Sequence, residues 1–123
     1  MIKIIIFNVT KQVVLAKEVR LARTFYERLL GWMGRPAVGE EEALVLLPCQ
    51  AIHTCFLKFP LDVLFVAADG QVLFTLANLR PFRFSPLIRR SRLVVELPAG
   101  RLKQTNTRMG DRLVFDDREE PYV

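Results

Sequence analysis

The amino-acid sequence predicts a mainly β protein: a compact single-domain β barrel or sandwich of about eight short strands, with one packed α-helix near residues 20–31. Three observations predict this fold. The chain has 123 residues, the size of one domain, so we expect residues 1–123 to form a single unit. Short apolar stretches rich in β-branched residues recur between proline, glycine and polar turns. Residues 20–31 stand apart because their apolar side chains have helical spacing.

The chain opens with a predicted hairpin, which the helix follows. Residues 2–7 are strongly strand-forming, and residues 12–19 are apolar again after a polar interval. In the helix the apolar residues fall on one face, and Gly31 is suited to end it in a left-handed conformation. We therefore expect Phe25 and Tyr26, on that face, to lie in the core.

Further strands are predicted after the helix. The first is a buried apolar run that Pro48 ends, and Pro60 separates the next two runs. Asp69 and Gly70 both tolerate positive φ and predict a tight hairpin turn. Prolines make the stretch 80–90 irregular. The predicted strands are residues 43–47, 52–57, 63–67, 71–79, 93–97 and 113–115.

The composition limits the class of protein. Hydrophobic residues make up 51% and charged residues 25% of the chain, as in a globular protein with a buried core. No apolar run reaches the ~18 residues of a membrane span, and the apolar opening is too short for a signal peptide. We therefore expect a cytoplasmic protein without membrane association, in which Cys49 and Cys55 stay reduced.

The net charge of +5 is unevenly distributed. Residues 70–110 contain eight basic side chains and one acidic one, whereas residues 40–69 contain five acidic side chains and one lysine. Thirteen of the eighteen basic residues are arginines, whose planar guanidinium group binds carboxylates and phosphates. This bias favours contact with an anion or a protein partner, although a solvated basic face also explains it.

Several segments of the chain resemble one known family. Ile-His-Thr at residues 52–54 and Phe-Pro-Leu-Asp-Val-Leu-Phe at residues 59–65 are similar to the central motif of the DUF192 family, also called UPF0127 and COG1430. Leu57 and Leu61 depart from the family's common Met and Ile, and both changes conserve volume. The resemblance implies a compact, mainly β domain and no particular activity, because the family has none assigned. Three further segments resemble other motifs of the family in the same order: residues 28–35, 96–100 and 110–111.

The central stretch contains His53, Cys55 and Asp62, which together suggest chemistry. On a strand, His53 and Cys55 would share a face, and a carboxylate from Asp62 would complete an activated thiol nucleophile. The apolar neighbours of Cys55 favour a buried, reduced thiol instead. One histidine and two cysteines at this spacing fit no usual zinc site, so we expect no metal and no cofactor.

The polar residues of this stretch have both a structural and a ligand-binding interpretation. An aspartate between apolar residues is costly to bury unless it is hydrogen-bonded. In the structural interpretation, Asp62 bonds backbone amides, His53 or a nearby arginine. In the ligand-binding interpretation, polar groups of the stretch line a small-molecule pocket. The candidate ligand-binding residues are His53, Thr54, Asp62, Arg35 and Arg80.

A second candidate surface is the arginine-rich stretch 80–92. Arginines that alternate with Phe82 and Phe84 are typical of sites for single-stranded nucleic acid, but no known RNA-binding signature accompanies them. Contact with a protein partner, or with solvent alone, is therefore favoured. The candidate partner or anion contacts are Arg83, Arg89, Arg90 and Arg92.

These patterns favour a small-molecule or partner-binding module with a pocket near His53 and Asp62. One alternative is an enzyme that uses His53 and Asp62 as acid/base groups on an anionic substrate. The other is nucleic-acid binding through residues 80–92. The sequence identifies neither a ligand nor a reaction.

Overall fold

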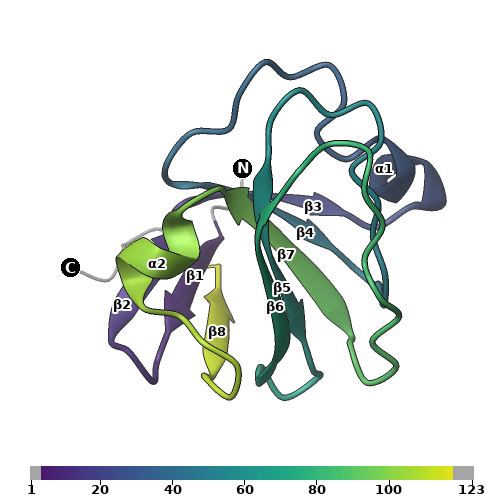
Figure 1. Ribbon diagram of the computed structural model, residues 1–123. Coiled ribbons are helices and arrows are strands. Elements are labelled where there is room, and N and C mark those ends of the chain that lie inside the picture. Colours follow the sequence, from purple (N-terminus) through teal and green to yellow (C-terminus); the bar gives the residue numbers. More distant parts are fainter. Residues whose placement is uncertain (1–3, 118–123) are drawn as a thin grey trace.

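The computed structural model describes residues 4–117, which form a mainly β, sandwich-like fold (Figure 1). Within these residues, eight strands form two sheets that do not close into a barrel, so the fold is the sandwich of the two predicted alternatives. The strands are β1 (Ile5–Asn8), β2 (Val13–Ala16), β3 (Glu18–Ala22), β4 (Glu42–Leu46), β5 (Leu61–Val66), β6 (Val72–Leu79), β7 (Leu93–Pro98) and β8 (Leu113–Asp116). The two short helices are α1 (Phe25–Leu30) and α2 (Arg101–Thr105).

The larger sheet has the strand order β3-β4-β7-β5-β6, and the smaller sheet has the order β2-β1-β8. β3 and β4 are parallel, whereas the other paired strands are antiparallel. β5 and β7 lie inside the larger sheet, and every residue of β5 is buried. Because both faces of β5 are covered, its sequence is an almost continuous apolar run.

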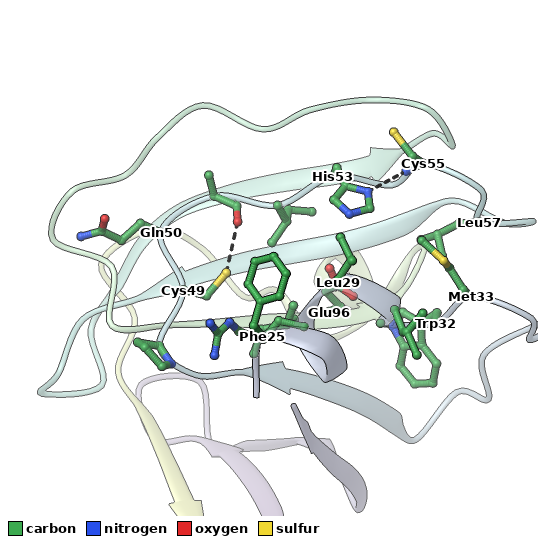
Figure 2. Close-up of a pocket in the computed structure, with 17 residues that line it drawn as sticks. Phe25, Leu29, Trp32, Met33, Cys49, Gln50, His53, Cys55, Leu57 and Glu96 are labelled. Atoms are coloured by element: carbon green, nitrogen blue, oxygen red, sulfur yellow. Dashed lines mark hydrogen bonds between the residues drawn. The ribbon is translucent and has the colours of Figure 1, made fainter. Parts of the chain in front are cut away.

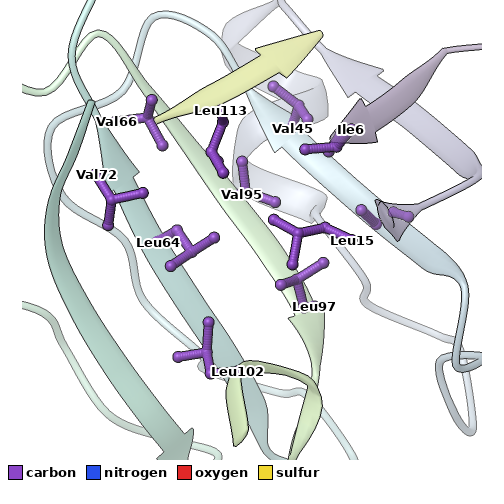
Figure 3. Close-up of a cluster of buried hydrophobic side chains, with 12 residues drawn as sticks. Ile6, Leu15, Val45, Leu64, Val66, Val72, Val95, Leu97, Leu102 and Leu113 are labelled. Carbon is purple, nitrogen blue, oxygen red and sulfur yellow. The ribbon is translucent and has the colours of Figure 1, made fainter. Parts of the chain in front are cut away.

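Side chains from the two sheets meet in one core (Figure 3). Ile6, Leu15 and Leu113 come from the smaller sheet, while Leu64 and Leu97 come from the larger one. Each fully buried side chain of this kind stabilises the fold by about 1.5–3 kcal/mol. This core covers one face of β4, β5 and β7 in the larger sheet, while the edge strand β6 contributes only Val72 to it.

The other face of the larger sheet is covered by connecting segments. Leu44, Val63 and Phe65 of this face pack with Trp32 and Ile52, which belong to the connections. The connections run from α1 to β4, from β4 to β5 and from β6 to β7 (Figure 1). Loops held on a rigid sheet are common locations for binding residues.

The predicted hairpin turn at Asp69 and Gly70 is confirmed. β5 and β6 are antiparallel partners on either side of this turn, and Gly70 has a φ of +92°. A Cβ atom at Gly70 would lie 2.3 Å from the carbonyl oxygen of Leu113. Glycine is therefore required both for its backbone conformation and for the close approach of β8.

The prediction of a packed helix over residues 20–31 is wrong about where the helix starts and about how it packs. Residues 18–22 form β3, and each of them pairs with a residue of β4. This long-range pairing outweighs the local helical periodicity. The helix begins only after Thr24, which forms a capping box with Glu27. No residue of α1 is buried, and Phe25 and Tyr26 are 74% and 67% exposed, so the prediction that they lie in the core is wrong.

Residues 52–57 do not form the predicted strand. His53 forms only an isolated bridge with Phe84, and Phe56 lies in a turn with a φ of +66°. Ile52 and Leu57 are apolar because they cover the larger sheet. The other predicted strands are present within residues 4–117, with residues 12–19 divided between β2 and β3. Residues 2 and 3 of the first predicted strand lie outside the described residues, and the sequence did not predict α2.

Candidate functional site

A cavity of about 300 Å³ lies on the loop-covered face of the larger sheet. It is bounded by α1 and the residues after it, by the segment 48–57 and by Glu96 of β7 (Figure 2). Most of its lining is apolar. The lining residues labelled in Figure 2 are Phe25, Leu29, Trp32, Met33, Cys49, Gln50, His53, Cys55, Leu57 and Glu96.

Hydrogen bonds to the loop between β6 and β7 hold one wall of the cavity. The amide of Ile52 donates to the Ser85 hydroxyl at 2.9 Å, and the amide of Ser85 donates to the Ile52 carbonyl at 2.9 Å. The amide of Cys49 donates to the carbonyl of Arg92 at 3.0 Å. The opposite wall is α1, and Trp32 anchors the chain beyond it in the interior. The first wall is therefore positioned by contacts outside the cavity, and the second by the buried Trp32, which itself lines the cavity.

Glu96 is the one acidic residue of the cavity lining, and it is only 3% exposed. Its neighbours across the sheet are Leu44 on β4 and Val63 on β5. Among residues 4–117 its carboxyl group has no hydrogen bond and no ion pair. Burial raises the pKa of Glu96 from 4.5 to about 8, partly offset by the positive charge of Arg20. The group is therefore mostly protonated at neutral pH.

Sequence reasoning did not identify Glu96 as a site residue. The available signal was a single acidic residue within the apolar run of residues 93–98. That signal alone could not show the burial of Glu96, because the burial depends on how β7 pairs with β4 and β5.

Trp32 contributes a second polar atom without a partner. Its indole Nε1 is buried and, of the described residues, none accepts a hydrogen bond from it. The guanidinium carbons of Arg20 and Arg35 lie 5.3 and 5.2 Å from the centre of its ring, within the range of a cation–π contact. Arg35 is also paired with Glu42 at 2.8 Å and does not line the cavity. Arg35 thus stabilises the neighbourhood of Trp32.

His53 is the one predicted ligand-binding residue that lines the cavity. Its Nδ1 accepts a hydrogen bond from the Cys55 amide at 3.1 Å, so in the neutral ring the proton is on Nε2. Both cysteines line the cavity and are free. The Cys49 thiol donates to the Ala51 carbonyl at 3.2 Å, and burial raises its pKa, which disfavours the thiolate that a nucleophile needs.

Asp62 lies away from the cavity and is satisfied by backbone amides. Its carboxylate accepts from the amides of Asn78 at 2.8 Å, Gly100 at 3.0 Å and Leu102 at 2.9 Å. Gly100 and Leu102 are at the start of α2, where Gly100 is the N-cap residue and forms no side-chain cap hydrogen bond. The Asp62 carboxylate, on β5, caps the helix instead. This geometry agrees with the structural interpretation of Asp62.

Thr54 also has a structural environment. It is fully buried, and its hydroxyl donates to the Arg80 carbonyl at 2.6 Å and accepts from the Arg83 amide at 2.9 Å. These bonds join the segment 48–57 to the loop after β6. The side chains of Arg80 and Arg83 are exposed, as are those of Arg89, Arg90 and Arg92 farther along the loop. The structure therefore does not bring His53, Thr54, Asp62, Arg35 and Arg80 together around one cavity.

Comparison with known proteins decides the family. The model of the family described as DUF192, uncharacterised ACR, COG1430, matches residues 5–115. The chain belongs to the DUF192 family. A UPF0127 protein of Pyrococcus furiosus is 32% identical over 114 residues, which cover 89% of this chain and 96% of the relative. A UPF0127 protein of Thermococcus sibiricus is 31% identical over 121 residues, covering 94% of this chain and 77% of the relative.

A solved structure shares the fold of this DUF192 domain. The crystal structure of a protein of unknown function from Novosphingobium aromaticivorans has a TM-score of 0.79 and 25% identity, covering 91% of this chain and 83% of that one. In residues 4–117 of the DUF192 chain, no three His, Cys, Asp or Glu side chains are grouped so that they could hold a metal ion. None of the helices described is both long and apolar enough to span a membrane.

Proposed function

We propose that this DUF192 domain binds a small organic amine with an apolar body in the cavity above Glu96. The observation that carries the proposal is a buried carboxyl group, without a hydrogen-bond partner among the described residues, in the lining of a mostly apolar cavity. Ligand pockets of this kind combine apolar walls with a few polar groups that fix the ligand.

The energetics of Glu96 support a role in binding. Burial raises the pKa of Glu96, so its ionised form is costly in the folded protein. An amine would remove this cost, because an ammonium group donates charge-assisted hydrogen bonds to a carboxylate. A carboxylate ligand could not pair with ionised Glu96, because the two negative charges would repel each other. The apolar body of the ligand would contact Leu29, Met33 and Leu57.

The acid/base enzyme built on His53 and Asp62 has less support. His53 lines the cavity, whereas Asp62 is fully engaged by three amides and does not line it. The two side chains therefore have no common place for a substrate. The proposed binding relies on Glu96 and the apolar walls, although Arg28 also lines the cavity.

A matched ligand series tests the proposal. Pentylamine, pentanol and pentanoate have similar apolar bodies, so differences in binding report the polar group. We expect pentylamine to raise the melting temperature of the protein more than pentanol, and pentanoate to have no effect. Calorimetric titration should give the same order of affinities.

Two variants make the test specific. Glu96→Gln keeps the shape of the side chain and should abolish the preference for pentylamine over pentanol. Glu41→Gln removes an exposed carboxylate away from the cavity and should preserve it. Equal effects of the amine and the alcohol on the wild-type protein, or an unchanged preference in Glu96→Gln, would refute the proposal.

A further inference from the structure

Three exposed phenylalanines gather beside the loop between β6 and β7. Phe56, Phe82 and Phe84 are 68%, 56% and 76% exposed. The rings of Phe56 and Phe82 form an edge-to-face pair with centroids 5.3 Å apart, although 26 residues separate them in the chain. None of the three lines the cavity above Glu96. The ring of Phe84 lies 6.4 Å from the ring of His53, which does line the cavity, so this aromatic surface adjoins the cavity.

The backbone that holds these rings outward is strained. Phe56 and Phe82 have φ values of +66° and +60°, a left-handed conformation that is unfavourable for bulky residues. The buried Thr54 maintains this backbone conformation. Its carbonyl oxygen accepts one hydrogen bond from the Phe82 amide at 3.0 Å and another from the Leu57 amide at 3.2 Å. Such strain persists where the surrounding structure enforces it and is concentrated at functional sites.

Arginines without acidic partners continue this surface along the loop. Over residues 80–92 there are five arginines and no acidic residue. In the described part of the chain, none of these five arginines forms an ion pair, whereas Arg35, Arg101 and Arg112 are each paired with a carboxylate. The loop arginines are Arg80, Arg83, Arg89, Arg90 and Arg92, and the structure leaves all five exposed.

We infer that Phe56, Phe82, Phe84 and the arginines of residues 80–92 form a binding surface for single-stranded nucleic acid. Unstacked bases would pack on the exposed rings, and phosphates would pair with the guanidinium groups, which have no acidic partner among the described residues. An acidic peptide would satisfy the arginines, but it offers planar rings only at aromatic residues, whereas every nucleotide carries a base. A duplex would satisfy the arginines too, but its bases are already stacked. The observations therefore favour a single strand.

Fluorescence anisotropy with a labelled oligodeoxythymidine of about 15 nucleotides tests the inference, since single-strand site sizes are of this order. We expect saturable binding that weakens as salt rises. Phe56→Ala and Phe84→Ala should each weaken it about tenfold, the usual order of effect for one stacked base. Arg89→Gln and Arg90→Gln should each reduce the slope of log K against log salt by about 0.7 if that arginine neutralises one phosphate.

Matched controls separate this surface from general basic charge. Tyr26→Ala removes an exposed aromatic ring on α1, and Arg108→Gln removes an exposed arginine outside the loop, so both should bind like wild type. Circular dichroism confirms that each variant is folded, and the exposed arginine variants test the surface even if a phenylalanine variant unfolds. Equal binding of a duplex of the same length, equal competition by polyglutamate, or wild-type affinity in the loop variants would each overturn the inference. None of these outcomes depends on the amine site.

Discussion

Asp62 and Glu96 lie on opposite faces of the larger sheet, although their strands are direct neighbours. Asp62 is paired with Leu97, and Glu96 is paired with Val63, so the two carboxyl groups project to opposite sides. Asp62 faces the side of α2 and accepts three amide hydrogen bonds. Glu96 faces the cavity, and its carboxyl group accepts no hydrogen bond from the described residues. One acid therefore stabilises the fold, and the other is available to a ligand.

Asp62→Asn should destabilise the protein by about 1–3 kcal/mol, the range expected when a buried hydrogen-bond partner is disturbed. Asparagine has a single acceptor oxygen and would direct its NH₂ group at amides that need an acceptor. Denaturant midpoints measure the effect, and Asp117→Asn at an exposed position is the control. If Asp62→Asn unfolds at the wild-type midpoint, the three hydrogen bonds do not hold α2 in place.

Glu96→Gln should change how stability depends on pH. The folded-state pKa of about 8 lies above the ordinary value of 4.5, so between these values the folded protein keeps a proton that the unfolded chain releases. Wild-type stability relative to Glu96→Gln should therefore fall as pH rises through this window, by up to about 1.4 kcal/mol per pH unit. The stability difference between the two proteins should level off above pH 8. Urea unfolding of both proteins from pH 5 to pH 9 tests this, and a pH-independent difference would contradict it.

Affinity for an amine should rise with pH for the same reason. The ammonium group pairs with ionised Glu96, and alkylamines stay protonated up to a pH of about 10. Below the pKa of about 8, pentylamine affinity should increase about tenfold per pH unit. Calorimetric titrations at several pH values measure this slope. Pentanol provides the comparison, and a similar slope for the alcohol would show that ionised Glu96 is not the acceptor.

Gly70→Ala should destabilise the protein far more than Gly110→Ala. The two glycines have nearly equal φ values of +92° and +93°, so alanine is strained by its φ angle to a similar degree at both. Only Gly70 has an atom too close for a Cβ, the Leu113 carbonyl oxygen. We expect alanine to lower the free energy of unfolding by about 1 kcal/mol at Gly110 and by about 2–4 kcal/mol at Gly70. Thermal unfolding distinguishes the two, and equal losses would mean that the contact with β8 adjusts freely.

Local sequence signals predicted most strands, because β-branched runs and turn residues act over a few positions. They predicted the β5–β6 hairpin through Asp69 and Gly70. They failed for residues 20–22 of β3, because pairing with the distant β4 decides their conformation. They also failed for residues 52–57, whose apolar side chains cover a sheet without joining it. In each case, the deciding contacts lie far away in the sequence.

The site was predicted only in part. The central stretch forms one wall of the cavity, and His53 lines it, while a role of either in binding stays a prediction. The prediction placed Asp62 with His53 because they are close in sequence and polar. Glu96 was missed because its environment depends on strand register, which neither composition nor spacing reveals.

The most direct test of the account is a carbon-13 NMR titration of the Glu96 side-chain carboxyl, with Glu96→Gln used to assign the signal. Without ligand, the midpoint should be near 8. Saturating pentylamine should move it to lower pH, because the ammonium group stabilises the ionised carboxylate, whereas pentanol should not lower it. A midpoint near 4.5 without ligand, or one that pentylamine leaves unchanged, would contradict the claim that Glu96 is an unpaired acid that accepts an amine.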